Sequence, residues 1–167
     1  MNFIHQTSRL QISEIITSKQ EPEFLVSVIE VLTPKVVENL PPYFQNINSI
    51  QSAQEWLEQI IFDGSLFTVN LVGEINPMGF VFISTENTSG THIGYLLGES
   101  YWGKGYATEI LKGLIGFLES EDKITNLIAG VATDNVASIK LLHKLGFIKS
   151  SSEDNGTIFF DYRLSQK

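Results

Sequence analysis

The spacing of hydrophobic residues predicts a strand and two helices in the first part of this chain. Residues 9–13 alternate apolar and polar side chains, as a half-buried strand does. Residues 21–32 and 52–62 carry apolar side chains at helical spacing. We expect Ser52 to cap the second helix, with Glu55 three residues later completing a capping box.

The centre of the chain predicts β-structure. Apolar and β-branched residues fill segments 66–72 and 79–84, and the segment between them, 73–78, supplies a turn, so we expect a hairpin. The polar residues 85–90 predict a further turn. Loops are also expected between the two helices, because the prolines there disfavour helix: Pro34, Pro41 and Pro42.

Strands and helices alternate in the remainder of the chain. Residues 92–97 and 127–132 predict strands, whereas residues 107–118 and 136–145 carry apolar side chains at helical spacing. A closing strand is expected over residues 157–164. Strands followed by alternating helices and strands indicate an α+β fold with an α/β-like second half, built as one mixed sheet flanked by helices.

The length of 167 residues predicts a single domain spanning 1–167, with room for a sizeable core. Hydrophobic residues make up 43% and charged residues 18% of the chain, which disfavours a disordered or coiled-coil protein. No apolar run approaches the roughly 20 residues of a membrane-spanning helix. The N-terminus lacks the pattern of a signal peptide. We therefore expect a cytoplasmic protein, monomer or homodimer, with no membrane partner.

The charge balance narrows the range of partners. Eleven basic and 19 acidic residues give a net charge of −8, which disfavours nucleic-acid binding because that binding relies on Lys and Arg. An acidic surface favours a cationic partner such as an amine, although solubility alone accounts for it equally well. With no cysteine, the chain has no disulfide, no thiolate metal site and no cysteine nucleophile, and we expect no metal.

Gly103 and Gly105 lie between an expected strand and an expected helix. Glycines there allow a tight turn and leave no side chain to keep a phosphate away. The unpaired amides at the start of helix 107–118 then point towards an anion, which the helix dipole also favours. The alternative is a plain tight turn. The segment matches neither a P-loop nor a dinucleotide-binding fingerprint.

A second polar element opens the helix expected at 136–145. Asn135 suits the N-cap of that helix and Gly146 suits the position just after its end, so capping explains both ends. Capping does not explain why Asn135 and Ser138 share the first turn, at a spacing that brings their polar groups together.

Taken together, the two elements resemble GNAT acetyltransferases. Segment 95–109, with Trp-Gly-Lys-Gly-Tyr-Ala-Thr-Glu at its end, is similar to the coenzyme-binding motif of that family, although Trp102 stands where a basic residue or glutamine often opens it. Segment 135–138, followed by Lys-Leu-Gly-Phe at 144–147, is similar to the second motif. The residues of the first motif are most similar to those of the branch that includes ribosomal-protein N-terminal acetyltransferases. The resemblance covers about residues 92–147.

The resemblance implies acetyl-coenzyme A as co-substrate and suggests contacts for it. Backbone groups of Leu96 and Leu97, on a splayed strand, would pair with the pantetheine arm. Asn135 would hydrogen-bond the pantetheine, and Ser138 would lie near it or the thioester sulfur. Backbone amides would hold the pyrophosphate, from Gly103, Lys104, Gly105, Tyr106, Ala107 and Thr108. Lys140 and Lys144 are interpreted as a solvated helix face rather than as phosphate ligands.

Catalytic candidates are fewer. In the resembled branch an acidic residue commonly precedes Ile-Gly-Tyr, and here His92 takes that place. An imidazole titrates near neutral pH and suits a general base, and strand alternation sets His92 on the same face as Gly94. The alternative is an ordinary surface histidine. Ser138 and Tyr162 are the other candidates, with Tyr162 either donating to a leaving thiolate or packing in the core. Glu99 and His143 are weaker.

These expectations converge on an N-acetyltransferase that moves an acetyl group to a primary amine by direct attack in a ternary complex, because no cysteine can carry an acyl-enzyme. A non-catalytic acyl-coenzyme A sensor on the same fold is the alternative. The acceptor stays open among a protein N-terminus, a polyamine and an amino sugar. Segments 22–62 and 85–90 are expected to shape its pocket, which Tyr43, Phe44 and Trp56 can line unless they pack in the core.

Overall fold

A computed structural model describes residues 2–84, 90–120 and 124–165 of the chain. Its strands are β1 (Asn2–Gln6), β2 (Leu10–Ile15), β3 (Ser65–Leu71), β4 (Gly79–Ser84), β5 (Thr91–Leu97), β6 (Asn126–Ala132), β7 (Ile148–Asp154) and β8 (Thr157–Arg163). Its helices are α1 (Pro22–Val31), α2 (Pro34–Val37), α3 (Ile50–Asp63), α4 (Tyr106–Leu118) and α5 (Val136–Lys144), with short 3₁₀ turns η1 (Pro42–Phe44) and η2 (Glu99–Tyr101).

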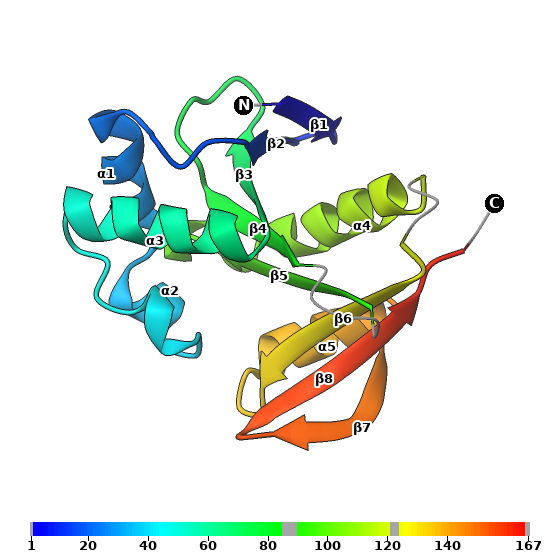
Figure 1. The fold of residues 1–167 in the computed structure, drawn as a ribbon. Coiled ribbons are helices and arrows are strands. Elements are labelled where there is room, and N and C mark those ends of the chain that lie inside the picture. The colour runs from blue at the N-terminus through cyan, green and yellow to red at the C-terminus, as the bar shows by residue number, and fades with distance from the viewer. Residues whose placement is uncertain (1, 85–89, 121–123, 166–167) are drawn as a thin grey trace.

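The strands form one sheet in the order β1-β2-β3-β4-β5-β6-β8-β7 (Figure 1). Every neighbouring pair is antiparallel except β5 and β6, which run parallel because α4 connects them. This arrangement confirms the expected α+β fold with a mixed, mostly antiparallel sheet flanked by helices. Within the described ranges, no helix is long and apolar enough to cross a bilayer.

Two strands escaped the sequence analysis. β1 pairs with β2 at one edge of the sheet and β7 pairs with β8 at the other. An edge strand buries little of its surface, so its hydrophobic alternation is weak. β7 illustrates this, because its sequence is Ile-Lys-Ser-Ser-Ser-Glu-Asp.

Helix α3 begins at Ile50, earlier than expected. Ser49 is its N-cap: the Ser49 hydroxyl accepts from the Ser52 N–H at 3.1 Å, and Ser52 Oγ accepts from the Ser49 N–H at 3.0 Å. The expected capping box of Ser52 and Glu55 was therefore wrong. A serine at the third helical position fills the role of the usual glutamate, and Glu55 instead accepts a hydrogen bond from Gln51.

The prolines between α1 and α3 also act differently from the expectation. Pro34 stands in the first turn of α2, where the Thr33 hydroxyl caps the helix by accepting from the Val36 N–H at 3.4 Å. Pro42 likewise stands in the first turn of η1, which has no side-chain cap. A proline is tolerated at a first helical position because the N–H it lacks would be unpaired there. The prediction of a loop at Pro34 and Pro42 was therefore wrong.

Side chains on the two faces of the sheet form two hydrophobic cores. One face of β2 to β5 packs with α4 and α5 through residues such as Val81, Ile93 and Leu114. The other face packs with α1 and α3 through residues such as Phe80 and Trp56. Alternation along the strands separates the two sets, since neighbouring residues point to opposite faces.

The sheet opens where β5 meets β6. These strands pair only between Thr91 and Leu127, His92 and Ile128, and Ile93 and Ala129. β6 continues in register with β8 up to Ala132, whereas β5 continues in register with β4 up to Leu97. The sheet therefore divides into two halves, and the C-terminal part of β5 keeps one backbone edge free of a β6 partner.

The turn before α4 is held from the N-terminal side of the chain. The Arg9 guanidinium forms an ion pair with Glu109 at 2.6 Å, donates to the Lys104 carbonyl at 3.2 Å and lies 4.3 Å from the centre of the Tyr106 ring. The Thr7 hydroxyl donates a short hydrogen bond to Glu109. One arginine thus links the β1–β2 connection to the start of α4.

These contacts shift the ionisation of Glu109. Its partial burial disfavours the charged form, but hydrogen bonds from Thr7 and Arg9 and the Arg9 charge outweigh that effect and lower its pKa below the ordinary 4.5. A carboxylate whose pKa is lower in the folded state stabilises the fold above its unfolded-state pKa. That stabilisation is lost as the pH falls through the folded-state pKa.

We predict that Glu109→Gln lowers the melting temperature at pH 7. The loss is about 1 kcal/mol, or about 2–4 °C, because Arg9 is 44% exposed and solvent screens the pair. Thermal unfolding followed by circular dichroism at pH 7 and pH 3 measures it, and the difference from wild type narrows at the lower pH. Glu38→Gln is the control, since Glu38 and Lys35 form a more exposed pair. An equal effect of both substitutions contradicts the prediction.

Candidate functional site: two cavities that meet at the divergence of β5 and β6

Two cavities meet where β5 and β6 separate. The turn cavity, about 420 Å³, lies along β5 and the segment 101–108. The aromatic cavity, about 400 Å³, lies between the α2–η1 segment, the end of α3 and the strands β5, β6 and β8. Five residues line both cavities, which makes them continuous: Asn39, Leu40, Tyr95, Asn135 and Ser138.

The glycine turn closes one end of the turn cavity. Gly103 and Gly105 have φ of +69° and +79°, a backbone region that favours glycine. A Cβ added to Gly103 would meet no atom within 4 Å, so the surface over this turn is open. Gly105 is the N-cap of α4 and has no side chain to cap it. The first amides of α4 therefore remain available to an anion, as expected.

The other residues of the turn fall into two groups. Tyr106, Ala107 and Thr108 line the turn cavity from the first turn of α4. The Lys104 side chain instead donates to the Ser100 carbonyl at 2.7 Å. That bond leaves the Lys104 backbone amide, rather than its ammonium group, as the part of the residue that belongs to the turn.

The free edge of β5 is formed by alternate residues. The Gly98 N–H donates to Met78 and the Leu96 carbonyl lies against Gly79, so these backbone groups face β4. Alternation then turns the backbone groups of Tyr95 and Leu97 towards the free edge. The Trp102 indole donates to the Leu97 carbonyl at 2.8 Å. Leu96 lines the turn cavity with its side chain, while its backbone pairs within the sheet.

A hydrogen-bonded pair of hydroxyls stands where the cavities meet. The Tyr95 hydroxyl and Ser138 Oγ are 3.2 Å apart and join β5 to α5. Burial raises the pKa of Tyr95 and outweighs the opposing effect of the Ser138 hydrogen bond. The phenol is therefore protonated at neutral pH and acts as a donor.

Asn135 is the N-cap of α5, as predicted. Its Oδ1 accepts from the Ser138 N–H at 3.1 Å, and its backbone carbonyl accepts from the Ile139 N–H. These bonds place Asn135 and Ser138 together at the junction of the two cavities, where both residues line each one. The side-chain amide nitrogen of Asn135 is then the group suited to donate to a bound molecule.

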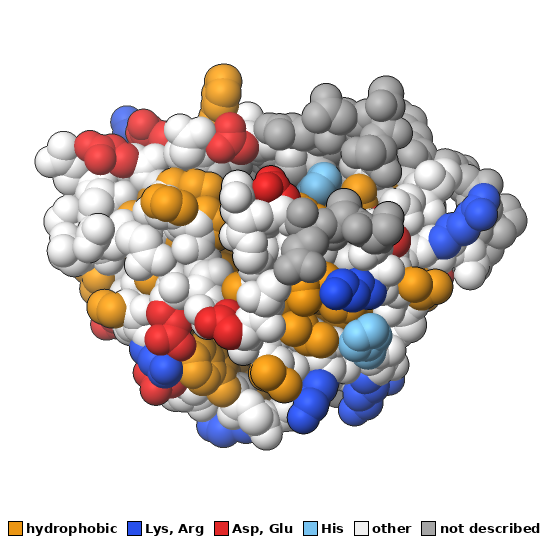
Figure 2. All heavy atoms as spheres, turned by 90° about the horizontal axis from the view of Figure 1, so that it is seen from below, with side chains coloured by type: hydrophobic (Ala, Val, Ile, Leu, Met, Phe, Trp, Pro, Cys, Tyr) orange, Lys and Arg blue, Asp and Glu red, His pale blue; other side chains and the backbone are white. Residues whose placement is uncertain are grey.

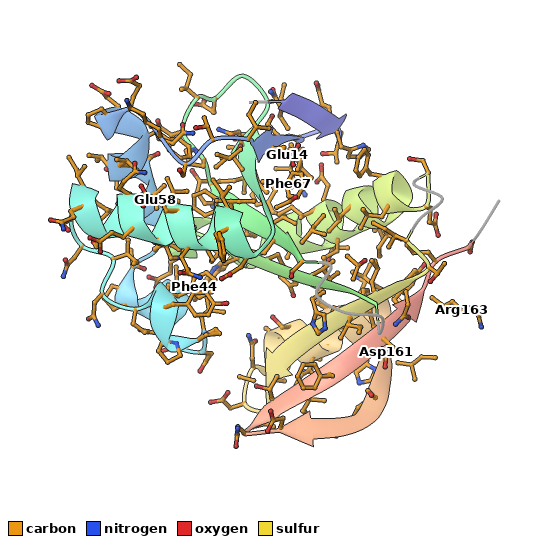
Figure 3. The ribbon with its side chains drawn as sticks, in the orientation of Figure 1. Glu14, Phe44, Glu58, Phe67, Asp161 and Arg163 are labelled. Carbon is orange, nitrogen blue, oxygen red and sulfur yellow. The ribbon has the colours of Figure 1, made fainter. Side chains whose placement is uncertain are left out.

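Aromatic rings form one wall of the aromatic cavity. Tyr43, Phe44 and Phe82 line it, with 4.7 Å between the ring centres of Tyr43 and Phe44 and 5.3 Å between those of Phe44 and Phe82. Figure 3 shows Phe44 beneath α3. Trp56 is 3% exposed and supports this wall from behind. Tyr43 and Phe44 are thus lining residues and Trp56 is a core residue.

His92 lines the aromatic cavity and is half-buried. It lies on the same strand face as Gly94, as the alternation predicted, and opposite Ser84 of β4. Three residues of extended strand separate His92 from Tyr95, a span of roughly 10 Å. An odd number of positions separates the two residues, so the imidazole and the phenol leave β5 on opposite faces, although both line the aromatic cavity.

The remaining candidates lie away from both cavities. Tyr162 packs on Phe147, with ring centres 5.0 Å apart, and is not among the described residues that line either cavity. Tyr162 therefore packs against the core, which was the alternative to its role as a donor to the thiolate. His143 is exposed and its ring meets Phe160 edge-on at 5.1 Å, and Lys140 and Lys144 are exposed on the same helix. Glu99 is exposed in η2.

On the face seen from below (Figure 2), acidic and basic side chains gather on different sides. In the view of Figure 2, from below, apolar side chains gather between a half richer in Asp and Glu and a half richer in Lys and His. Among the described residues, no group of three or more His, Asp or Glu side chains is placed to hold a metal ion. The turn 85–89, expected to shape the acceptor pocket, lies outside the described residues.

Three residues of the junction were missed by the sequence analysis as site residues: Tyr95, Asn39 and Leu40. Tyr95 was quoted only as part of a motif, and its pairing with Ser138 spans 43 positions of sequence. Alternation along β5 could have indicated Tyr95, because it turns the side chains of Tyr95 and Leu96 to opposite faces of the sheet. Asn39 and Leu40 follow α2, a helix that the sequence analysis did not predict, so no local pattern pointed to them.

Comparisons with known proteins agree with the fold described above. The chain is 29% identical over 116 residues to the uncharacterized N-acetyltransferase p20 of Bacillus licheniformis, which covers 66% of this chain and 64% of that protein, slightly under two thirds. A GNAT-family acetyltransferase from Bacillus anthracis has a TM-score of 0.76 at 19% identity, covering 96% of this chain and 98% of that one.

The fold is also similar to RimL, a ribosomal L7/L12 alpha-N-protein acetyltransferase solved in complex with coenzyme A. The TM-score is 0.79 at 15% identity, over 98% of both chains. At this identity the likeness concerns the fold. The model of the acetyltransferase (GNAT) domain matches residues 16–148. Because that match spans more than half of this chain, the chain belongs to the GNAT acetyltransferase family.

Proposed function

We propose that this protein transfers an acetyl group from acetyl-coenzyme A to a primary amine by direct attack in a ternary complex. The observation that supports it is the junction of two cavities at Tyr95 and Ser138. One cavity ends at an anion-binding turn and suits the donor, and the other opens beside a histidine and suits the acceptor. A thioester held at the junction would face both.

Backbone groups would provide most of the contacts to the donor, acetyl-coenzyme A. The amides from Gly103 to Thr108 would hold the pyrophosphate at the start of α4, where the helix dipole adds to the attraction. The free edge of β5, at Tyr95 and Leu97, would pair with the pantetheine arm as a missing strand would. Asn135 would donate to the same arm through its side-chain amide.

The chemical step requires three changes. The nitrogen of a neutral amine attacks the thioester carbonyl carbon, a C–N bond forms, and the C–S bond then breaks. The proton that the amine loses passes to His92, through water where the roughly 10 Å of strand requires it. The departing thiolate accepts a hydrogen bond from the Tyr95–Ser138 pair and takes a proton from bulk water to leave as the thiol, while His92 returns the amine's proton to bulk water. No cysteine competes for the acetyl group.

Thiol release with acetyl-coenzyme A and a panel of amines tests the proposal. We predict release with at least one amine, and loss of it in Gly105→Ala, because a Cβ strains the backbone at φ +79° and would lie 3.6 Å from the Arg9 guanidinium that holds this turn. Gly73→Ala is the matched control, since Gly73 has φ +87° in a turn away from both cavities. Calorimetry should show acetyl-coenzyme A binding weakened at least tenfold in Gly105→Ala and unchanged in Gly73→Ala.

Binding of acetyl-coenzyme A without transfer to any amine would instead support a coenzyme sensor. No binding by wild type, or equal binding by both glycine variants, would sink the donor-site assignment.

We predict that Tyr95→Phe lowers kcat by about tenfold to a hundredfold and leaves the KM for acetyl-coenzyme A within about twofold. The physical reason is that the phenol donates to Ser138 Oγ and so strengthens the hydrogen bond of the pair to sulfur charge, which develops only as the C–S bond breaks. Steady-state kinetics of Tyr95→Phe, Ser138→Ala and the double variant measure it. Because the two hydroxyls act as one pair, the double variant should lose little more than the worse single variant. Full additivity of the two losses argues against a shared role.

We predict that His92→Ala lowers kcat by about a hundredfold, because the amine loses its general base. Added imidazole should restore part of the rate, because it fits the space left in the cavity wall. Steady-state kinetics with and without imidazole measure both effects. His143→Ala serves as control, since His143 is exposed on α5. An unchanged kcat in His92→Ala removes His92 from the mechanism.

A further inference from the structure

The lining of the aromatic cavity narrows the class of acceptor. We propose that the acceptor is a small primary amine that carries one aromatic or bulky apolar group on a short linker. This inference rests on the proposed function and adds to it the substrate class. A cavity of about 400 Å³ is within the range that holds a small organic molecule.

The wall that would receive the apolar group is rigid. Phe44 is 5% exposed and meets Phe82 edge-to-face, with 86° between their ring planes. Trp56 packs edge-on behind both rings, at 5.9 Å from Phe44 and 6.3 Å from Phe82. Rings in this arrangement present edges and faces that favour a further aromatic ring. Tyr43, 51% exposed, extends the wall to the rim of the cavity.

Small residues leave space in front of that wall. Gly94 of β5 and Gly130 and Ala132 of β6 line the cavity where larger side chains would fill it. A Cβ on Gly94 would lie 3.4 Å from the Phe82 ring, and one on Gly130 would lie 3.2 Å from the Phe159 ring. Neither glycine has a positive φ, so the backbone does not require glycine at these positions. Their effect is to keep the space between the rings open.

The register of β4 and β5 brings the aromatic wall beside the junction. Phe82 lies directly opposite Gly94, one residue before Tyr95. Neighbouring strand residues point to opposite faces, so the Phe82 ring and the Tyr95 side chain reach the cavity from the two faces of the sheet. Both residues line one cavity of about 400 Å³, and that volume limits the linker between the amine and its apolar group to a short one.

The charge of the cavity suits an amine. Asp63 ends α3 and lines the cavity, and among the described lining residues it is the one with a formal charge at neutral pH. The carboxyl end of a helix carries partial negative charge, which adds to the attraction of Asp63 for a cation. Extended polycations and polyhydroxylated sugars would instead place polar groups against the aromatic wall without partners, at a cost in free energy.

The test compares thiol release for 2-phenylethylamine, n-propylamine, spermidine and a short peptide at saturating acetyl-coenzyme A. We expect kcat/KM for 2-phenylethylamine to exceed the other values at least tenfold, because its ring buries apolar surface that the others lack. Gly94→Val should fill the space beside Phe82 and lower kcat/KM for 2-phenylethylamine at least tenfold. The KM for acetyl-coenzyme A should stay within twofold, because Gly94 is not among the described residues that line the turn cavity.

Tyr43→Ala and Phe62→Ala form a matched pair of variants. Tyr43 lies on the rim, whereas Phe62 of α3 is 88% exposed and is not among the described lining residues. We expect Tyr43→Ala to raise KM for 2-phenylethylamine at least threefold and Phe62→Ala to leave it unchanged. Because both side chains are largely exposed, neither variant should fail to fold, so a loss specific to Tyr43→Ala reports on the cavity.

Calorimetry of 2-phenylethylamine with the coenzyme A-loaded protein separates this inference from the proposed function. Binding that Gly94→Val abolishes supports the acceptor class even where no acetyl transfer occurs, in which case the proposed function alone fails. Transfer to spermidine or the peptide at equal or higher kcat/KM overturns the acceptor class and leaves the proposed function standing. Absence of both binding and transfer for 2-phenylethylamine also overturns the acceptor class.

Discussion

Hydrogen bonding between β5 and β6 ends after Ile93 and Ala129, and the rest of the site depends on that limit. Each strand has a better continuation elsewhere, β5 with β4 and β6 with β8. Their divergence leaves the backbone of Tyr95 and Leu97 without a β6 partner, with the Leu97 carbonyl held by the Trp102 indole, and makes room for two cavities. Unpaired backbone groups favour a ligand that can replace the missing strand, and α5 brings Ser138 to the point where the strands part.

The glycine turn and its support provide the second constraint. Positive φ at Gly103 and Gly105 curls the chain so that the first amides of α4 stay unpaired. The turn has little rigidity of its own, because no side chain caps the start of α4. Arg9 supplies that rigidity from the other end of the sheet, through Glu109, the Lys104 carbonyl and the Tyr106 ring. An ion pair outside the cavities therefore positions the glycine turn.

Much of the fold could be predicted from the sequence, because most elements carry strong local signals. The β3–β4 hairpin, β5, α4, β6, α5 and β8 match their expected positions within one or two residues. The misses have physical causes. β1 and β7 are edge strands with little burial, the start of α3 uses serine in place of glutamate, and Pro34 begins a helix. Each depends on a partner or a cap that hydrophobic spacing does not reveal.

The sequence by itself determined the local geometry of the glycine turn and of the start of α5. Positive φ at two glycines and an N-cap at Asn135 are local requirements of the chain, so the residues themselves indicate them. Only the tertiary structure decided what meets at the junction. Tyr95 and Ser138 are 43 residues apart, and Phe44 and Phe82 come from two separate elements, η1 and β4. Strand register and the divergence of the sheet bring these side chains together, and neither is encoded in any single segment.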